Sequence, residues 1–180
     1  MKQLMMIVLI AAFAASCSDV GNFTVEQSTG EVRVEGSNSP INDVLPDNVL
    51  PPLGLDFDLQ SELEERDADG ADGVYLDALT LTVTDTAKAD ENDEDNFDFL
   101  NSVEFFVESR KQGTELDRVL VGSIDPVPAG REILDVDVDN SINLKPYAQE
   151  GMRITTRGNG SVPPDDVTIA GDVVIEVEIF

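Results

Sequence analysis

The strongest structural signal in this chain is a two-residue alternation of apolar and polar side chains. It recurs in five segments, residues 55–60, 79–84, 103–109, 134–139 and 173–180. A period of two is typical of a β-strand with one buried and one solvent-facing side. Because a sheet with one apolar face must be covered by another layer, the pattern predicts a sandwich of packed sheets.

The apolar positions of these segments identify the expected core. Every second residue is Leu, Val, Ile or Phe, and the positions between them are mostly Asp, Glu or Thr. The side chains expected inside are Leu55, Phe57, Leu59, Leu79, Leu81, Val83, Val103, Phe105, Val107, Leu134, Val136, Val138, Val173, Ile175, Val177 and Ile179.

Weaker strand patterns complete the expected fold. They occur at residues 23–27, 31–36, 118–124 and 152–157, and the first two are expected to form a hairpin through residues 28–30. The fold class predicted is all-β: a single antiparallel β-sandwich of about nine strands, jelly-roll or immunoglobulin-like in outline, following a cleaved signal peptide.

Two segments are expected to depart from strand structure. Residues 36–54 are rich in proline, which removes backbone donors from a sheet, so this part is expected to be irregular. Its apolar residues predict that it packs on the sandwich. Those residues are Ile41, Val44, Leu45, Val49 and Leu50. Residues 141–151 are expected to hold one helical turn, ended by Gly151.

The first residues have the features of an export signal. Lys2 is followed by an apolar run over residues 4–13 and then by the small residues Ala14, Ala15 and Ser16. The apolar run is shorter than the roughly 20 residues that a membrane-spanning helix needs. Residues 1–16 are therefore expected to be a cleaved signal peptide.

The end of this leader, Ala14-Ala15-Ser16-Cys17, resembles the lipobox of bacterial lipoproteins, with Ala14 where that family most often has leucine. The resemblance implies that Cys17 is acylated and becomes the mature N-terminus. It also implies, because Ser18 follows Cys17, sorting to the outer membrane. The alternative is an ordinary signal peptide with a chance cysteine near its end.

This reading predicts three parts of the chain: the signal peptide, a lipidated N-terminus and short tether over residues 17–22, and an acidic sandwich domain over residues 23–180. If the domain instead begins near residue 55, residues 18–54 form a spacer.

The charge of the chain restricts its partners. It has 37 acidic and 11 basic residues, a formal net charge of −26. Such a chain is not expected to bind nucleic acid or an anionic membrane surface by charge, so membrane attachment must come from the lipid. The acidity is expected to be a solvated surface, with calcium binding and attraction of a basic partner as alternatives.

Two acidic loops are candidates for calcium, which prefers six to eight oxygen ligands from carboxylate-rich turns. The candidate ligands are Asp67, Asp69, Asp72, Asp90, Asp93 and Asp95. The pattern of an EF-hand is absent: from Asp67, the sixth position is Asp72 instead of Gly. The alternative is that both are solvated loops, the first with Gly70 and Gly73 in its turns.

Missing residues restrict catalysis. The chain has no histidine and one cysteine, which excludes a Ser-His-Asp triad, histidine-ligated zinc and, if Cys17 is lipidated, a thiol nucleophile. The expected function is that of a lipid-anchored cell-envelope protein, not an enzyme, with a binding or structural domain and an envelope protein or a glycan as partner. The alternative is a calcium-dependent adhesion or glycan-binding module, and the third hypothesis is a carboxylate-based hydrolase.

Overall fold

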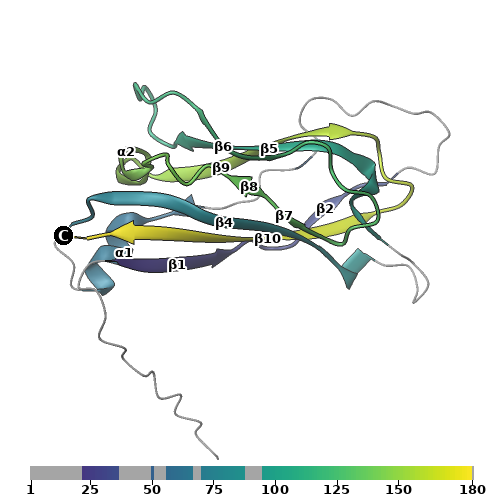
Figure 1. Cartoon of the computed structure of the whole chain (residues 1–180), viewed down its shortest axis with the longest axis horizontal. Coiled ribbons are helices and arrows are strands. Elements are labelled where there is room, and N and C mark those ends of the chain that lie inside the picture. The colour runs from purple at the N-terminus through teal and green to yellow at the C-terminus, as the bar shows by residue number, and fades with distance from the viewer. Residues whose placement is uncertain (1–21, 37–49, 51–55, 67–69, 88–94, 180) are drawn as a thin grey trace, which may run out of the picture.

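The computed structural model describes residues 22–36, 50, 56–66, 70–87 and 95–179. In these residues the chain forms an all-β sandwich of two antiparallel sheets, with two short helices at one end (Figure 1). This confirms the fold class that the alternating pattern predicts.

The first sheet has the order β1-β10-β4-β7, and β2 also pairs with β10. Its strands are β1 (Asn22–Ser28), β2 (Val32–Val34), β4 (Gly73–Thr84), β7 (Ile133–Asp135) and β10 (Val167–Glu178). The two longest strands, β4 and β10, lie beside each other at its centre.

The second sheet has the order β3-β9-β5-β6-β8. Its strands are β3 (Asp56–Phe57), β5 (Leu100–Ser109), β6 (Val119–Ile124), β8 (Asp137–Val138) and β9 (Met152–Gly160). The helices are α1 (Leu59–Glu65) and α2 (Lys145–Gln149), with the short 3₁₀ turns η1 (Asp85–Ala87) and η2 (Phe97–Phe99).

The core forms between the sheets from the alternating apolar side chains. Of the expected core residues that the structure describes, Val138 and Ile179 are half-buried and all others are buried. Leu55 lies outside the described residues. The face predicted for each alternating segment is therefore confirmed, since Leu81 and Phe105 are completely buried and Glu104 and Glu176 are partly exposed.

The predicted hairpin between the first two strands is wrong. β1 and β2 both run antiparallel to β10, as two parts of one edge strand. From Ser28 to Val32 the edge advances four residues while β10 advances three, so the edge holds one extra residue, as in a β-bulge. The N–H and the hydroxyl oxygen of Thr29 both bond to the backbone of Gly171, at 2.7 Å each, which keeps the chain on β10 instead of letting it turn back.

The strand predicted at residues 55–60 is also mostly wrong, because a helix begins within it. Asp58 caps α1: its carboxylate accepts hydrogen bonds from the N–H and the hydroxyl of Ser61, at 3.2 and 3.0 Å. Leu59 and Leu63, one turn apart, are both buried. Leu59 satisfies the strand pattern and the helix pattern equally, so the alternation alone was misleading.

The segment at residues 134–139 alternates as expected but belongs to both sheets. β7 pairs with β4 in the first sheet, and β8 pairs with β6 in the second. Between the two strands, the N–H of Val136 donates to the carbonyl of Leu79 in the first sheet at 2.9 Å. After β8, the N–H of Asp139 donates to the carbonyl of Val121 in the second sheet at 2.8 Å. The chain crosses here from one layer to the other.

Of the two segments expected to depart from strand structure, residues 141–151 are described completely and residues 36–54 only in part. Of residues 36–54, only Gly36 and Leu50 are described, and Leu50 is buried, with its carbonyl accepting a hydrogen bond from the Thr156 hydroxyl at 3.1 Å. The predicted helical turn is α2, and Gly151 follows it with a φ of 81°. Both the turn and its glycine stop are confirmed.

Candidate functional site

A cleft of about 490 Å³ opens at the end of the sandwich where the two helices lie. The residues that line it include members of β3, α1 and α2, and both helices lie at this end of the sandwich (Figure 1). Small-molecule sites in proteins are typically about 300–1,000 Å³, so this cleft has the size of a ligand site.

The lining of the cleft is apolar in its depth and polar at its surface. The buried lining side chains are Phe57, Leu59, Leu63, Ala71 and Ala148. The polar lining side chains are Asp58, Gln60, Arg110, Lys145 and Gln149. A ligand entering the cleft therefore meets polar and charged groups first.

The start of α2 is attached to the first sheet, which places Lys145. The N–H of Leu144 donates to the carbonyl of Val74 at 2.7 Å. The side-chain oxygen of Asn143 accepts hydrogen bonds from the N–H groups of Val74 and Lys145, at 3.3 and 2.9 Å. These contacts hold the first residue of α2 at the cleft.

The end of α2 places Arg110. The N–H of Arg110, the residue after β5, donates to the carbonyl of Gly151 at 2.8 Å. Gly151 has the positive φ that glycine adopts most easily. A Cβ on Gly151 would lie 3.7 Å from Cδ of Arg110, so the stem of the arginine packs over the glycine.

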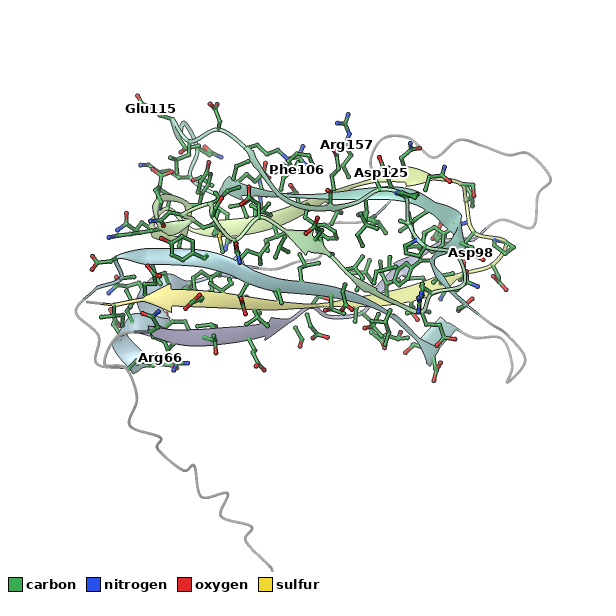
Figure 2. The ribbon with its side chains drawn as sticks, in the orientation of Figure 1. Arg66, Asp98, Phe106, Glu115, Asp125 and Arg157 are labelled. Atoms are coloured by element: carbon green, nitrogen blue, oxygen red, sulfur yellow. The ribbon has the colours of Figure 1, made fainter. Side chains whose placement is uncertain are left out.

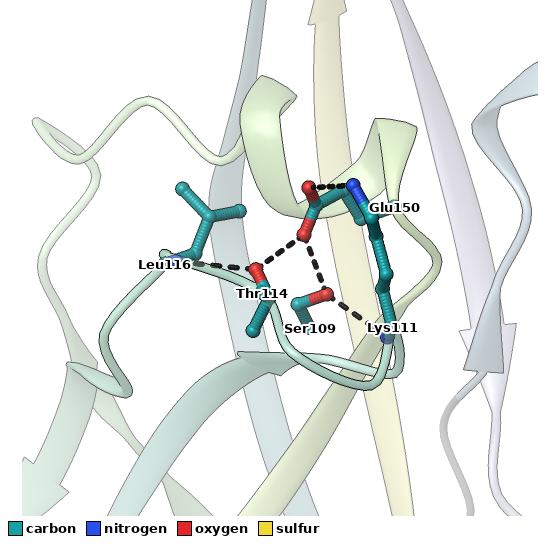
Figure 3. A network of polar contacts seen from close by, with 5 residues as sticks. All are labelled: Ser109, Lys111, Thr114, Leu116 and Glu150. Atoms are coloured by element: carbon teal, nitrogen blue, oxygen red, sulfur yellow. Dashed lines mark hydrogen bonds and ion pairs between the residues drawn. The ribbon is translucent and has the colours of Figure 1, made fainter.

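A network centred on Glu150 joins the loop after β5 to α2 (Figure 3). The Glu150 carboxylate accepts hydrogen bonds from the hydroxyls of Ser109 and Thr114, and from the ammonium group of Lys111 at 2.9 Å. The Thr114 oxygen in turn accepts from the N–H of Leu116 at 3.1 Å. Ser109 and Lys111, the residues on either side of Arg110, are both bonded to Glu150, so the network orders the loop beside the cleft.

These donors favour the ionised form of Glu150. Hydrogen bonds from Thr114, Lys111 and Ser109 lower the pKa of the Glu150 carboxyl to about 2. The carboxylate therefore stays charged at every pH at which such a protein is expected to work.

The charge of the cleft lining is opposite to that of the chain. Among the described residues, three ionisable side chains line the cleft: Asp58, Arg110 and Lys145. The Asp58 carboxylate is engaged with Ser61, whose backbone and side-chain hydrogen bonds lower the pKa of Asp58. Two of the three groups are thus cations, in a chain with 37 acidic and 11 basic residues.

Lys145 differs from most of the other described cations. A described carboxylate lies within 4.0 Å of Arg33, Arg66, Lys111, Arg153 and Arg157. Arg110 also has an interaction partner. Lys145 is half-buried, and no carboxylate in the described part of the chain is within that distance of its ammonium group. The cleft therefore holds a cation without a described counter-charge.

The cleft lies at the end of the sandwich where β1 begins. Asn22 pairs with Glu178, which pairs in turn with Gly73 at the start of β4. The guanidinium group of Arg66, after α1, lies 4.2 Å from the ring centroid of Phe23. The first residues of β1 and the helix that lines the cleft are thus in direct contact.

Most of the site residues predicted from the sequence lie outside the described residues. These are Cys17, Asp67, Asp69, Asp90 and Asp93. Lipid attachment at Cys17 therefore stays a prediction.

Asp72 and Asp95, the two described calcium candidates, are far apart. Asp72 precedes β4 and is exposed, whereas Asp95 is buried and lies beyond the other end of that strand, 12 residues or about 40 Å away. Figure 2 shows Arg66 and Asp98, which flank the two acidic loops, at opposite ends of the molecule.

These two aspartates cannot share an ion, and no group of three or more potential metal ligands occurs within the described ranges. The calcium hypothesis for the remaining aspartates stays a prediction. Thermal unfolding with and without millimolar calcium tests it, because a ligand that binds only the folded state raises the midpoint.

Arg110 and Lys145 were not recognised as site residues in the sequence. Each is one of only 11 basic residues in the chain, and this rarity alone is a weak indication of a binding site. Arg110 and Lys145 line the same cleft only because β5, β9 and α2 pack together, and no local sequence motif indicates this packing.

No protein-family model matches the chain, and no curated protein with a similar sequence is found. Within the part of the chain that the structure describes, no helix is both long and apolar enough to cross a membrane. Function is therefore inferred from the lipobox-like residues 14–17 and from the cleft.

Proposed function

We propose that this protein is a lipid-anchored component of the bacterial cell envelope whose β-sandwich has a non-catalytic binding role. The resemblance of residues 14–17 to a lipobox supports acylation of Cys17, and Ser18 supports location at the outer membrane. The cleft supports the binding role, because it combines the size of a ligand site with a distinct charge.

The observation that carries the proposal is that the cleft and the start of β1 share one end of the sandwich. Five residue steps separate Cys17 from Asn22, which reach at most about 18 Å at about 3.6 Å per step. A lipid on Cys17 would hold the cleft end near the bilayer, although the net charge of −26 gives the domain no attraction to an anionic surface.

The anchor is tested by expressing the full precursor in a bacterium with Cys17→Ser and, separately, with Ser18→Asp. We expect Cys17→Ser to release the domain from the membrane fraction or leave its precursor uncleaved, and to abolish incorporation of labelled fatty acid. We expect Ser18→Asp to keep the lipid and move the protein from the outer to the inner membrane. A Cys17→Ser protein that is processed to the same size and stays membrane-bound would contradict the proposal.

A further inference from the structure

We infer that the cleft binds a small polar molecule carrying a carboxylate, with Lys145 and Arg110 as its cationic contacts. This inference rests on the proposed binding role and names the class of ligand for it.

The first argument is the charge balance at Lys145. Removing an ammonium group from water is unfavourable unless a counter-charge or hydrogen-bond acceptors compensate. Lys145 is half-buried at the cleft with no carboxylate within 4.0 Å among the described residues, whereas Lys111 nearby is paired with Glu150 at 2.9 Å. A ligand carboxylate would supply the counter-charge.

The second argument is the way Arg110 is held. Its backbone is bonded to Gly151, its stem packs over that residue, and its neighbours Ser109 and Lys111 are both bonded to Glu150. A guanidinium group offers a planar set of donors that matches a carboxylate in two-point contact. Because the backbone and the stem of Arg110 are already held, a bound ligand has to order only the exposed end of the side chain.

The third argument concerns the remaining polar lining. Asp58 is occupied by Ser61, and the amide nitrogen of Gln60 donates to Glu64 at 2.9 Å. Gln149 is exposed at the cleft and offers both a donor and an acceptor. Gln149 therefore suits a hydroxyl or amide group on the rest of the ligand, so the expected ligand is polar as well as anionic.

The experiment uses the lipidated protein in a neutral detergent and follows thermal unfolding by circular dichroism. The probes are pairs of molecules that differ in the carboxylate: succinate with succinamide, and glucuronate with glucose. Inorganic phosphate is the test for a different anionic group. We expect at least one carboxylate to raise the midpoint in a saturable way while its neutral counterpart does not.

Variants then locate the binding. We expect Lys145→Glu to raise the Kd of that carboxylate at least about tenfold, which corresponds to about 1.4 kcal/mol. Lys145→Gln and Arg110→Gln should have the same effect in weaker form, and they provide a test should Lys145→Glu unfold the domain. Arg131→Glu is the matched control, because Arg131 is an exposed cation at the opposite end and should leave the Kd unchanged.

Three results would overturn the inference. If no carboxylate raises the midpoint, or if phosphate does so in their place, the ligand class is wrong. If a carboxylate and its neutral counterpart bind equally and Lys145→Glu has no effect, the cationic contacts are wrong while a binding role stands. The fractionation of Cys17→Ser is independent of all three, so a failed anchor is distinguished from a failed ligand assignment.

Discussion

At the scale of single residues, the shape of the cleft depends on a side chain that is not part of its lining. Glu150 accepts hydrogen bonds from Ser109, at the end of β5, and from Lys111 and Thr114 in the loop that follows. That loop also carries Arg110. Charge-assisted hydrogen bonds of this kind are stronger than neutral ones. Glu150 is therefore expected to be a positioning residue for the cleft.

Replacing Glu150 by Gln keeps the shape of the side chain and removes its charge. We expect Glu150→Gln to lower the thermal midpoint by a few degrees and to speed amide hydrogen exchange at Arg110 and Lys111. Glu115→Gln is the control, since Glu115 is exposed in the same loop and should have little effect. Equal effects of the two changes would show that the network does not order the loop.

The difference in stability between the wild type and Glu150→Gln is expected to depend on pH. The pKa of Glu150 is about 2 in the folded protein against an ordinary value of 4.5, so the folded state favours the ionised form. Its contribution to stability is complete above about pH 4.5 and is lost as the pH falls toward 2. The difference between wild type and Glu150→Gln should therefore narrow over that interval, and a difference that stays constant down to pH 2 would contradict the assignment.

At the scale of elements, β10 does most to hold the first sheet together. It pairs with β1 and β2 on one side and with β4 on the other, and its inward side chains are buried. Loss of packing in β10 is therefore expected to affect the whole sheet.

We expect Ile175→Ala to lower the free energy of unfolding by about 2–5 kcal/mol, because it leaves a cavity at a side chain that is 1 % exposed. Glu176→Lys, on the other face of the same strand, should change it by about 0.5 kcal/mol or less. Urea unfolding of both variants measures the difference. A larger loss for Glu176→Lys than for Ile175→Ala would contradict the assignment of faces.

The elements show which parts of the fold a sequence can predict. Alternation reports the burial of each side chain, so the strand faces were predictable even at residues 134–139. Alternation does not show which strands are neighbours in a sheet. The crossing from β7 to β8 and the single edge formed by β1 and β2 were therefore not predictable. α1 was missed because the cap at Asp58 lies within an alternating run.

The candidate site was less predictable than the fold. The resemblance of residues 14–17 to a lipobox is local in the sequence and is visible without a structure, and lipid attachment at Cys17 stays a prediction. Arg110 and Lys145 are separated by a strand, a crossing and a helix start, and the cleft between α1 and α2 exists only after both sheets have formed. When the cations of a binding site lie far apart in the sequence, they form no motif by which the site could be recognised.

At the scale of the whole molecule, the proposed anchor determines which end of the sandwich faces the membrane. The cleft lies at the end where β1 begins, and the exposed loop around Ala129 lies at the other. The length of β4, about 40 Å, separates the two ends. With the short tether, the cleft end should be the membrane-proximal one.

Energy transfer to acceptors on lipid headgroups tests this direction. We expect a donor dye on Gln149→Cys in the lipidated protein on vesicles to transfer more efficiently than one on Ala129→Cys. Each introduced thiol is unique, because the sulfur of a lipidated Cys17 is a thioether. Inserting about ten Gly and Ser residues after Asp19 should weaken the difference. More efficient transfer from Ala129→Cys would mean that the cleft end points away from the membrane.

The pairing of β1 with β10 also has a consequence for folding during the proposed export across a membrane. Among the described strands, β1 is the first along the chain, and the strand that it pairs with, β10, is the last. Contacts between such distant segments form slowly, because the chain between them must first be closed into a loop. A chain threaded from its N-terminus through an export channel carries β1 across early and β10 late. If the proposed export takes place in this way, the middle strand of the first sheet is missing during transit, and the sheet is expected to be completed only after the whole chain has crossed.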